Sequence, residues 1–186
     1  PRRAERRECV RLYLADGRCL IDGTSSWWTA CHGYNHPHIR AAVASQLDAM
    51  PHVMLGGLVH AQALDLARRL SCALPGDLDH VFFAESGSVA VEVALKIALQ
   101  YWLNRGERGR TRFLTFEHAY HGDTFGAMAV CDPVEGMHKL FGGVLAPQLV
   151  VPLPKTAEGF KDFEQTVGRH AKELAGVILE PLVQAA

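Results

Sequence analysis

The sequence predicts an α/β fold that contains a largely parallel sheet. Several short apolar segments in its second half have the length and the β-branched or aromatic content of buried strands. Between them lie longer segments whose apolar residues repeat at helical spacing, most clearly over residues 160–174. Strands that alternate with helices tend to pair in parallel, because each helix returns the chain to the edge where the next strand starts. The predicted strands are residues 81–84, 112–116, 149–153 and 176–181.

The first residues predict a β-hairpin. Residues 10–14 and 19–21 alternate in polarity on either side of Asp16-Gly17, a dipeptide typical of tight hairpin turns. The arginines at positions 2–7 are interleaved with Glu5 and Glu8, so we expect a solvated terminus rather than a basic binding surface.

Two helices are predicted after the hairpin. Pro37 suits the first turn of a helix, and an apolar stripe with helical spacing follows over residues 39–50. A second amphipathic helix is expected around residues 64–70, before the turn at Pro75-Gly76. Between the hairpin and the first helix, a turn-rich segment leads to Trp27 and Trp28. Two adjacent tryptophans in a turn cannot both face one core, so one of them is expected to contact a ligand or a neighbouring subunit.

The central strand, turn and helix form the first candidate site. Residues 81–84 predict a short buried strand, which ends in the turn Ser86-Gly87-Ser88. Residues 89–103 are apolar on nearly every face, which predicts a helix buried all round. A small-residue turn at a helix N-terminus presents free backbone N–H groups to an anion such as phosphate. The sequence has neither the G-x-G-x-x-G pattern of dinucleotide binding nor the Gly-Lys-Ser/Thr of a P-loop.

The second candidate site follows the strand at 112–116. In alternating α/β folds, ligands bind at the carboxyl ends of the strands, and residues 117–124 occupy such a position. Tyr120 can stack on a flat ring or serve as a core tyrosine. His121 and Asp123 can act together as a general base, or they can organise the loop through hydrogen bonds.

The spacing of the histidines and cysteines predicts neither a metal site nor a set of disulfides. His32, His36 and His38 lie in a loop with Gly, Asn and Pro and without a nearby acidic residue, so no metal site is predicted. The five cysteines are odd in number and widely spaced, without a C-x-x-C motif. They predict reduced thiols in a cytoplasmic protein.

Composition excludes further classes of function. The chain has 186 residues, 48% hydrophobic and 21% charged, with a net charge of −1, as expected of a soluble globular protein. With this net charge, the protein has no overall positive electrostatic field that would attract nucleic acid. No stretch approaches the roughly 20 apolar residues of a membrane span.

Five sequence motifs are similar to those of the class III aminotransferases. The resemblance implies fold type I of the pyridoxal-phosphate enzymes, with residues 1–32 as a hairpin segment of the small domain and residues 33–186 as part of the large, cofactor-binding domain. It runs from about Val10 to Gln184. The motifs are Gly-Thr-Ser-Ser-Trp-Trp (23–28), His-Gly-Tyr-Asn-His-Pro (32–37), Ser-Gly-Ser-Val-Ala-Val-Glu (86–92), Ala-Leu-Gln-Tyr-Trp (98–102) and Tyr-His-Gly-Asp-Thr-Phe-Gly-Ala-Met (120–128).

The resemblance assigns roles around pyridoxal 5'-phosphate. It implies that Gly87 and Ser88 bind the cofactor phosphate, in agreement with the helix N-terminus argument above. Tyr120 is implied to stack on the pyridine ring, while His121 and Asp123 shape the same loop. The resemblance also implies that Glu180 contacts the cofactor and that Trp27 and Trp28 line the substrate pocket.

The Ser-Ser-Trp-Trp and Gln-Tyr-Trp motifs resemble the family members of biotin biosynthesis. Those members transfer the amino group of S-adenosylmethionine to 8-amino-7-oxononanoate, which gives 7,8-diaminononanoate. The resemblance also implies a homodimer, because pocket residues in this class come from two subunits. The alternative within the family is another ω-aminotransferase that acts on ornithine, γ-aminobutyrate or a diamine.

The sequence departs from the family in its lysines. The family attaches its cofactor to a lysine through a Schiff base, and none of the five lysines here matches that lysine. We therefore assign no catalytic residue to this chain, expect it to be an N-terminal fragment, and expect it to be inactive alone. A non-catalytic scaffold remains the alternative outside the enzymes. The lysines are Lys96, Lys139, Lys155, Lys161 and Lys172.

Overall fold

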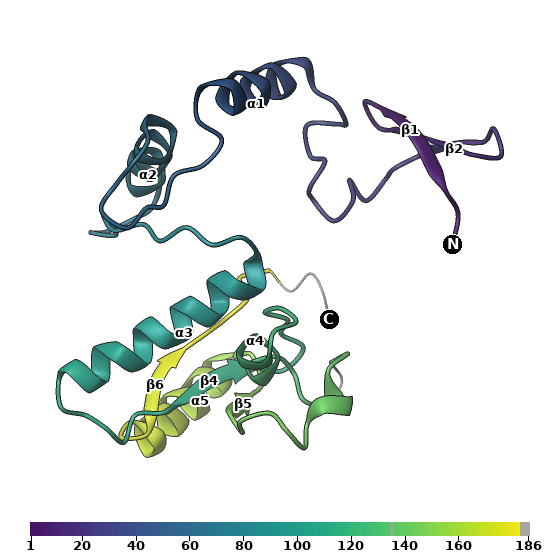
Figure 1. The fold of residues 1–186 in the computed structure, drawn as a ribbon. Helices are drawn as coiled ribbons and strands as arrows, with labels where there is room; N and C mark the ends of the chain where they lie inside the picture. Colours follow the sequence, from purple (N-terminus) through teal and green to yellow (C-terminus); the bar gives the residue numbers. More distant parts are fainter. Residues whose placement is uncertain (135, 183–186) are drawn as a thin grey trace. The chain divides into compact units, whose positions relative to one another are not determined.

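The structure, a computed structural model, describes residues 1–134 and 136–182. It divides into two compact units, Pro1–Val81 and Phe82–Ala186, and most of their helices and strands are labelled in Figure 1. Each unit is described by itself. The domain boundary expected near residue 32 concerns the complete fold of the family and stays a prediction.

The first unit begins with an antiparallel sheet of three strands in the order β1-β2-β3. The strands are β1 (Ala4–Glu8), β2 (Arg11–Leu14) and β3 (Cys19–Ile21), and the predicted hairpin around Asp16-Gly17 is present as β2 and β3. The basic segment is solvent-exposed as expected, but it forms the strand β1 rather than a loose terminus. Arg6 supports this strand, because its guanidinium lies 3.8 Å from the centroid of the Tyr13 ring on β2.

Two helices complete the first unit, α1 (Pro37–Ala49) and α2 (Ala61–Ala73). Pro37 occupies the first turn of α1 as predicted, and His60 caps α2 by accepting a hydrogen bond from the Ala63 amide over 3.3 Å. The predicted apolar stripe of α1 is present but not buried. Its four side chains, at Ile39, Val43, Leu47 and Met50, are 43–58% exposed.

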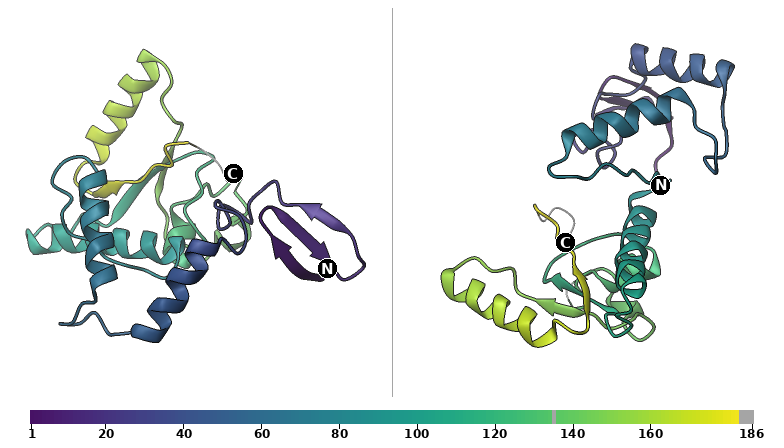
Figure 2. Two further views of the ribbon diagram at one scale, coloured as in Figure 1. Left: turned by 90° about the horizontal axis from the view of Figure 1, so that it is seen from above. Right: turned by 90° about the vertical axis from the view of Figure 1, so that its left-hand side faces the viewer.

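The second unit is a parallel α/β layer structure, as the sequence predicts. Its sheet has the order β5-β4-β6, with β4 (Arg112–Phe116) in the centre between β5 (Leu149–Val151) and β6 (Leu174–Val177). The helix α3 (Gly87–Asn104) packs on one face of the sheet. The helix α5 (Ala157–His170) covers the opposite face (Figure 2). The short helices of this unit are α4 (Phe125–Ala129) and the 3-10 turn η1 (Lys139–Phe141).

The core of this unit lies on both faces of β4. Leu114 and Thr115, neighbours on this strand, are both 0% exposed. The Thr115 hydroxyl donates to the Val130 carbonyl over 2.5 Å, which satisfies a polar group inside the core. One apolar cluster joins β4 to α3, and the other joins it to α5, where Phe116 stacks on Phe163. The carboxyl end of β4 is therefore held rigidly, and the candidate loop starts there.

Two predictions around α3 are wrong. Residues 81–84 form no strand, and Phe82 is 70% exposed. Apolar content alone does not make a strand, because the backbone also needs a pairing partner, and none lies among the described residues. The helix itself is present, but only one face is covered, with Ile97 and Tyr101 still 56% and 51% exposed.

Within the described residues, no helix is long and apolar enough to cross a membrane.

Glu92 links α3 to the helix that follows the candidate loop. Its carboxylate accepts hydrogen bonds from the amides of Gly126 and Ala127, over 2.6 and 3.3 Å, at the N-terminus of α4. A Cβ atom at residue 126 would lie 2.8 Å from the Glu92 carboxyl carbon, so a side chain there would displace the carboxylate from these bonds. Burial acts to raise the pKa of Glu92, but the Thr124 side chain, these two bonds and the charge of Lys96 outweigh burial and lower it.

We predict that Glu92→Ala destabilises the fold, because it leaves the first amides of α4 without their acceptor. The expected loss is about 1–3 kcal/mol in the free energy of unfolding, measured by denaturant titration of the complete protein. Glu164→Ala on the exposed side of α5 is the control and is expected to change little. Equal stability of the two variants would contradict this role of Glu92.

Candidate functional site

Three separate segments of the second unit line one pocket of about 520 Å³. They are the N-terminus of α3, the loop after β4 and the segment after β6. Five of the residues that the sequence singles out meet here, although up to 93 positions separate them in the chain: Gly87, Ser88, Tyr120, His121 and Glu180. Asp123 lies beside them, bonded to Ser88 and Tyr120.

The N-terminus of α3 supplies backbone donors to this pocket. Ser86 caps the helix, and its hydroxyl accepts a hydrogen bond from the Val89 amide over 3.2 Å. The amides of Gly87 and Ser88 come before the first intrahelical bond and donate to no acceptor among the described residues. With the positive end of an 18-residue helix behind them, these two amides favour an anion.

The loop after β4 lies directly against this helix end. The Asp123 amide donates to the Ser88 hydroxyl over 2.9 Å. Gly122 makes the approach possible, because a Cβ atom there would lie 2.8 Å from the Ser88 Cα atom. Its φ of +131° is also one that residues with a side chain rarely adopt. The contact therefore depends on the glycine.

Cys131 holds the same loop from behind. Its buried sulfur accepts a hydrogen bond from the His121 amide over 3.1 Å and donates to the Ala127 carbonyl over 3.2 Å. Burial raises the pKa of this thiol, so it serves here as a packed, protonated group.

His121 contributes a buried nitrogen atom next to the pocket. Burial lowers the pKa of its imidazole, although the charge of Glu180 acts in the opposite direction. The Nε2 atom is buried and has no hydrogen-bond partner among the described residues. A buried polar atom without a partner is uncommon in a folded protein, and His121 is one of the residues that line the pocket.

Tyr120 is held by both neighbouring segments. Its hydroxyl donates to Asp123 Oδ2 over 2.9 Å, and its amide donates to Glu180 Oε2 over 3.3 Å. Burial and the hydrogen bond to Asp123 raise the pKa of Tyr120 to about 12, so the phenol stays protonated at neutral pH. Its ring is half-buried and offers a flat surface at the pocket.

His138 contacts the site from behind Tyr120 and Asp123, and the sequence does not reveal it. It lies in the irregular segment after α4, where no chemistry is predicted. Its ring stacks on Tyr120, with centroids 5.8 Å apart, and its Nε2 atom lies 2.9 Å from Asp123 Oδ1. This bond is the main reason why the pKa of Asp123 is lowered. A single histidine in an irregular segment carries no local signal of such a contact.

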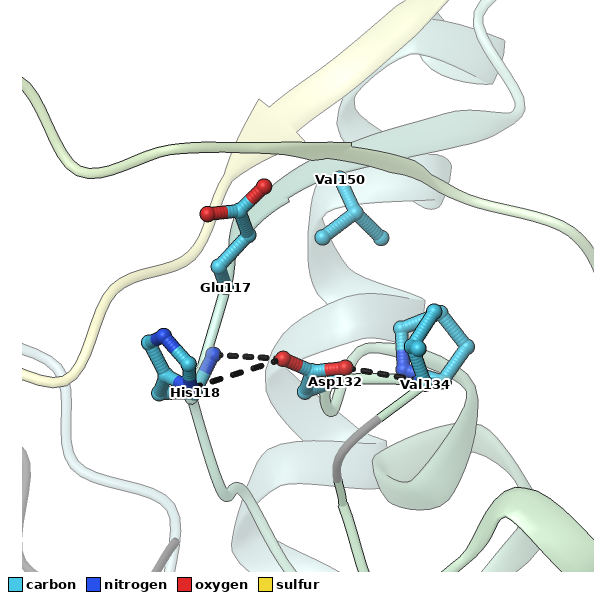
Figure 3. A pocket seen from close by; sticks show the side chains of 6 residues that line it. Glu117, His118, Asp132, Val134 and Val150 are labelled. Carbon is cyan, nitrogen blue, oxygen red and sulfur yellow. Dashed lines mark hydrogen bonds and ion pairs between the residues drawn. The ribbon is translucent and has the colours of Figure 1, made fainter.

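A second cavity, of about 400 Å³, lies beside the start of the candidate loop (Figure 3). In it the Asp132 carboxylate lies between His118 and Val134 and accepts a 2.7 Å hydrogen bond from each backbone amide. His118 has a left-handed φ of 61°, which this bond helps to hold. Asp132 thus fixes the turn that leads from β4 to Tyr120.

Trp27 and Trp28 belong to the first unit and are 88% and 70% exposed. Both lie in a left-handed turn over residues 25–28, which Asp22 organises by accepting hydrogen bonds from Thr24, Ser26 and Tyr34. The bond from Tyr34 is the largest cause that lowers the pKa of Asp22. The turn presents two large aromatic surfaces to their surroundings, as expected of residues that cannot both enter one core.

The pocket in the second unit is suited to an anionic group attached to a flat ring. The amides of α3 supply the anion contacts, and Tyr120 supplies the flat surface. The residues described by the structure contain no cluster of three or more His, Cys, Asp or Glu side chains placed to hold a metal ion.

Comparison with known proteins gives the family. The model of the class III aminotransferase family matches residues 1–186, so the chain belongs to the class III aminotransferases. Among curated relatives, the adenosylmethionine-8-amino-7-oxononanoate aminotransferase of Corynebacterium glutamicum is 44% identical over 182 residues. The enzyme of the same name from Saccharomyces cerevisiae is 41% identical over 185 residues. These alignments cover 95% and 90% of this chain, but only 43% and 38% of the two relatives, respectively.

Solved structures agree with the predicted fold. The adenosylmethionine-8-amino-7-oxononanoate aminotransferase of Methanocaldococcus jannaschii superposes with a TM-score of 0.88 at 34% identity, over 96% of this chain and 41% of that one. A PLP-bound amine transaminase from an uncultivated Pseudomonas species gives a TM-score of 0.84 at 30% identity, over 98% and 45%. The prediction of fold type I is confirmed.

Proposed function

We propose that this chain supplies the phosphate- and ring-binding part of a pyridoxal 5'-phosphate-dependent aminotransferase of biotin biosynthesis. The complete enzyme would transfer the amino group of S-adenosylmethionine to 8-amino-7-oxononanoate and form 7,8-diaminononanoate. The observation that carries the proposal is the convergence of the α3 N-terminus and the Tyr120–Gly122 loop on one pocket. The names of the relatives that are 41% and 44% identical support the two substrates.

The phosphate site is formed by the first turn of α3. The amides of Gly87 and Ser88 would donate to phosphate oxygens, with the helix dipole adding to the attraction. The Ser88 hydroxyl already accepts a hydrogen bond from the Asp123 amide, so its own hydrogen is available to the same phosphate. The site is therefore built chiefly from neutral donors on a rigid helix.

The ring site is formed by the loop after β4. Tyr120 would stack on the pyridine ring, and His121 would offer its unpartnered Nε2 atom to a polar group nearby. Asp123 and Glu180 keep Tyr120 in place through their bonds to its hydroxyl and amide. When bound, pyridoxal 5'-phosphate supplies a carbonyl carrier for the amino group and an electron-withdrawing ring. The lysine that attaches it belongs, in this proposal, to the part of the relatives that the chain does not cover.

The substrate side of the proposal rests on Trp27 and Trp28. Their exposed rings provide the stacking surface that an adenosyl group needs. We further propose that the enzyme is a cytoplasmic homodimer, since the family builds its pocket from two subunits.

The variant Gly122→Ala tests the phosphate site. The added Cβ atom forces the loop away from Ser88, so we expect the affinity of the complete protein for pyridoxal 5'-phosphate to fall about tenfold or more. Affinity is measured by absorbance titration of the cofactor-free protein. Gly168→Ala on α5 is the matched control, because a Cβ atom there meets nothing within 4 Å. Equal affinity of the two variants would remove the support for this site.

The variant Trp27→Ala tests the amino donor. Stacking on an adenine ring contributes about 1–3 kcal/mol, so the KM for S-adenosylmethionine is expected to rise about tenfold. The KM for 8-amino-7-oxononanoate, measured in parallel, is expected to change less. Unchanged use of S-adenosylmethionine would instead favour an ω-aminotransferase with another amino donor, in line with the similarity to an amine transaminase at 30% identity.

A further inference from the structure

His138 is a buried polar residue whose position in the site has no counterpart in the sequence motifs. Its side chain is only 7% exposed, whereas that of its partner Asp123 is 66% exposed. The imidazole therefore forms the fixed side of this pair, and the carboxylate forms the side that would move without it. A bond between a buried donor and a carboxylate is stronger than one between two exposed groups, because water competes less for it.

The contacts of the ring assign its hydrogen. Nε2 lies 2.9 Å from Asp123 Oδ1 and has to donate, because a carboxylate only accepts. Nδ1 is buried without a hydrogen-bond partner among the described residues, so a hydrogen on this atom would be an unsatisfied buried donor. The geometry thus favours the tautomer with its hydrogen on Nε2, directed at Asp123.

The segment that carries His138 is held by its own backbone. The Phe141 amide donates to the His138 carbonyl over 2.9 Å, which starts the 3-10 turn η1. The imidazole then stacks on Tyr120 at an interplanar angle of 28°. Since Tyr120 donates to the second oxygen of Asp123, the three side chains form a closed ring of contacts. Each member fixes the other two.

We propose that His138 is a positioning residue for the candidate site, which fixes the Asp123 carboxylate and, through it, the plane of the Tyr120 ring. The proposal rests on the proposed function, in which Tyr120 packs against the cofactor. His138 itself does not line the pocket, so its effect passes through the other two side chains.

Two variants separate the hydrogen bond from the stacking contact. His138→Gln keeps an amide donor that reaches the position of Nε2, but it loses the ring. His138→Phe keeps a ring of similar shape that stacks on Tyr120, but it loses the donor. If His138→Phe does not fold, His138→Asn takes its place, because its shorter amide does not reach Asp123.

The first measurement needs no cofactor. The complete protein is labelled with 3-fluorotyrosine, and the fluorine resonance of Tyr120 is assigned by its loss in Tyr120→Phe. We expect His138→Phe to broaden this resonance in the cofactor-free protein, because the Tyr120 ring is no longer held in one plane. His138→Gln removes the stacked ring and therefore shifts the resonance, but we expect its line width to stay close to that of the parent. An unchanged line width in His138→Phe, or equal broadening in both variants, would overturn the proposal.

The second measurement uses the cofactor. We expect His138→Phe to lower the affinity of the complete protein for pyridoxal 5'-phosphate about tenfold, the cost of losing one charge-assisted hydrogen bond that fixes the Tyr120 ring. In the presence of Asp123→Asn, the same substitution is expected to add little, because its effect passes through Asp123. If the effects of His138→Phe and Asp123→Asn add in full, the effect of His138 does not pass through Asp123, and the proposed route is wrong.

The two proposals fail in distinguishable ways. If the parent protein does not bind pyridoxal 5'-phosphate, the proposed function fails, while the fluorine spectrum still decides whether His138 positions Tyr120. If the parent binds the cofactor and His138→Phe leaves the Tyr120 resonance unchanged, only the role of His138 fails.

Discussion

The candidate site depends on one close contact between a loop and a helix end. Gly122 allows the loop after β4 to lie against Ser88, the second residue of α3, at a distance that leaves no room for a Cβ atom. This contact brings the free amides of α3 and the ring of Tyr120 to the same pocket. Without it, the helix N-terminus would be one anion-attracting end among several, with no flat surface beside it. The contact therefore combines a helix N-terminus, which many proteins have, with a flat aromatic surface in the same pocket.

The rest of the second unit supports this contact from several sides. Asp132 fixes the turn before Tyr120, and Cys131 holds the backbone of His121. Glu92 reaches from α3 to the start of α4 and so ties the helix to the far end of the same loop. Most of these groups accept hydrogen bonds from backbone amides, which fixes the main chain as well as the side chains. The loop is thus held before any ligand arrives, and this lowers the cost of ordering it on binding.

Local patterns account for much of the fold, but not for contacts chosen over long distances. The Asp16-Gly17 hairpin, the helix that starts at Pro37 and the strand at residues 112–116 follow from turn chemistry, proline geometry and apolar runs. The position of Tyr120 also follows, because ligands of α/β folds bind at the carboxyl ends of the strands and Tyr120 comes after β4. The same rule does not place Ser88 beside it, because no strand precedes Ser88. Residues 81–84 were predicted as a strand because sequence shows apolar content but not a pairing partner. His138 was missed for a related reason, since its partners lie 15 and 18 positions away.

The central claim is that the first turn of α3 binds a phosphate group, and the most direct test compares two ligands that differ only in that group. The affinity of the cofactor-free complete protein is measured for pyridoxal 5'-phosphate and for pyridoxal, under the same conditions. We expect the phosphate to increase affinity about a hundredfold, through the amides of Gly87 and Ser88 and the helix dipole. Equal affinity for the two ligands would contradict it, because the helix end would then contribute nothing to binding.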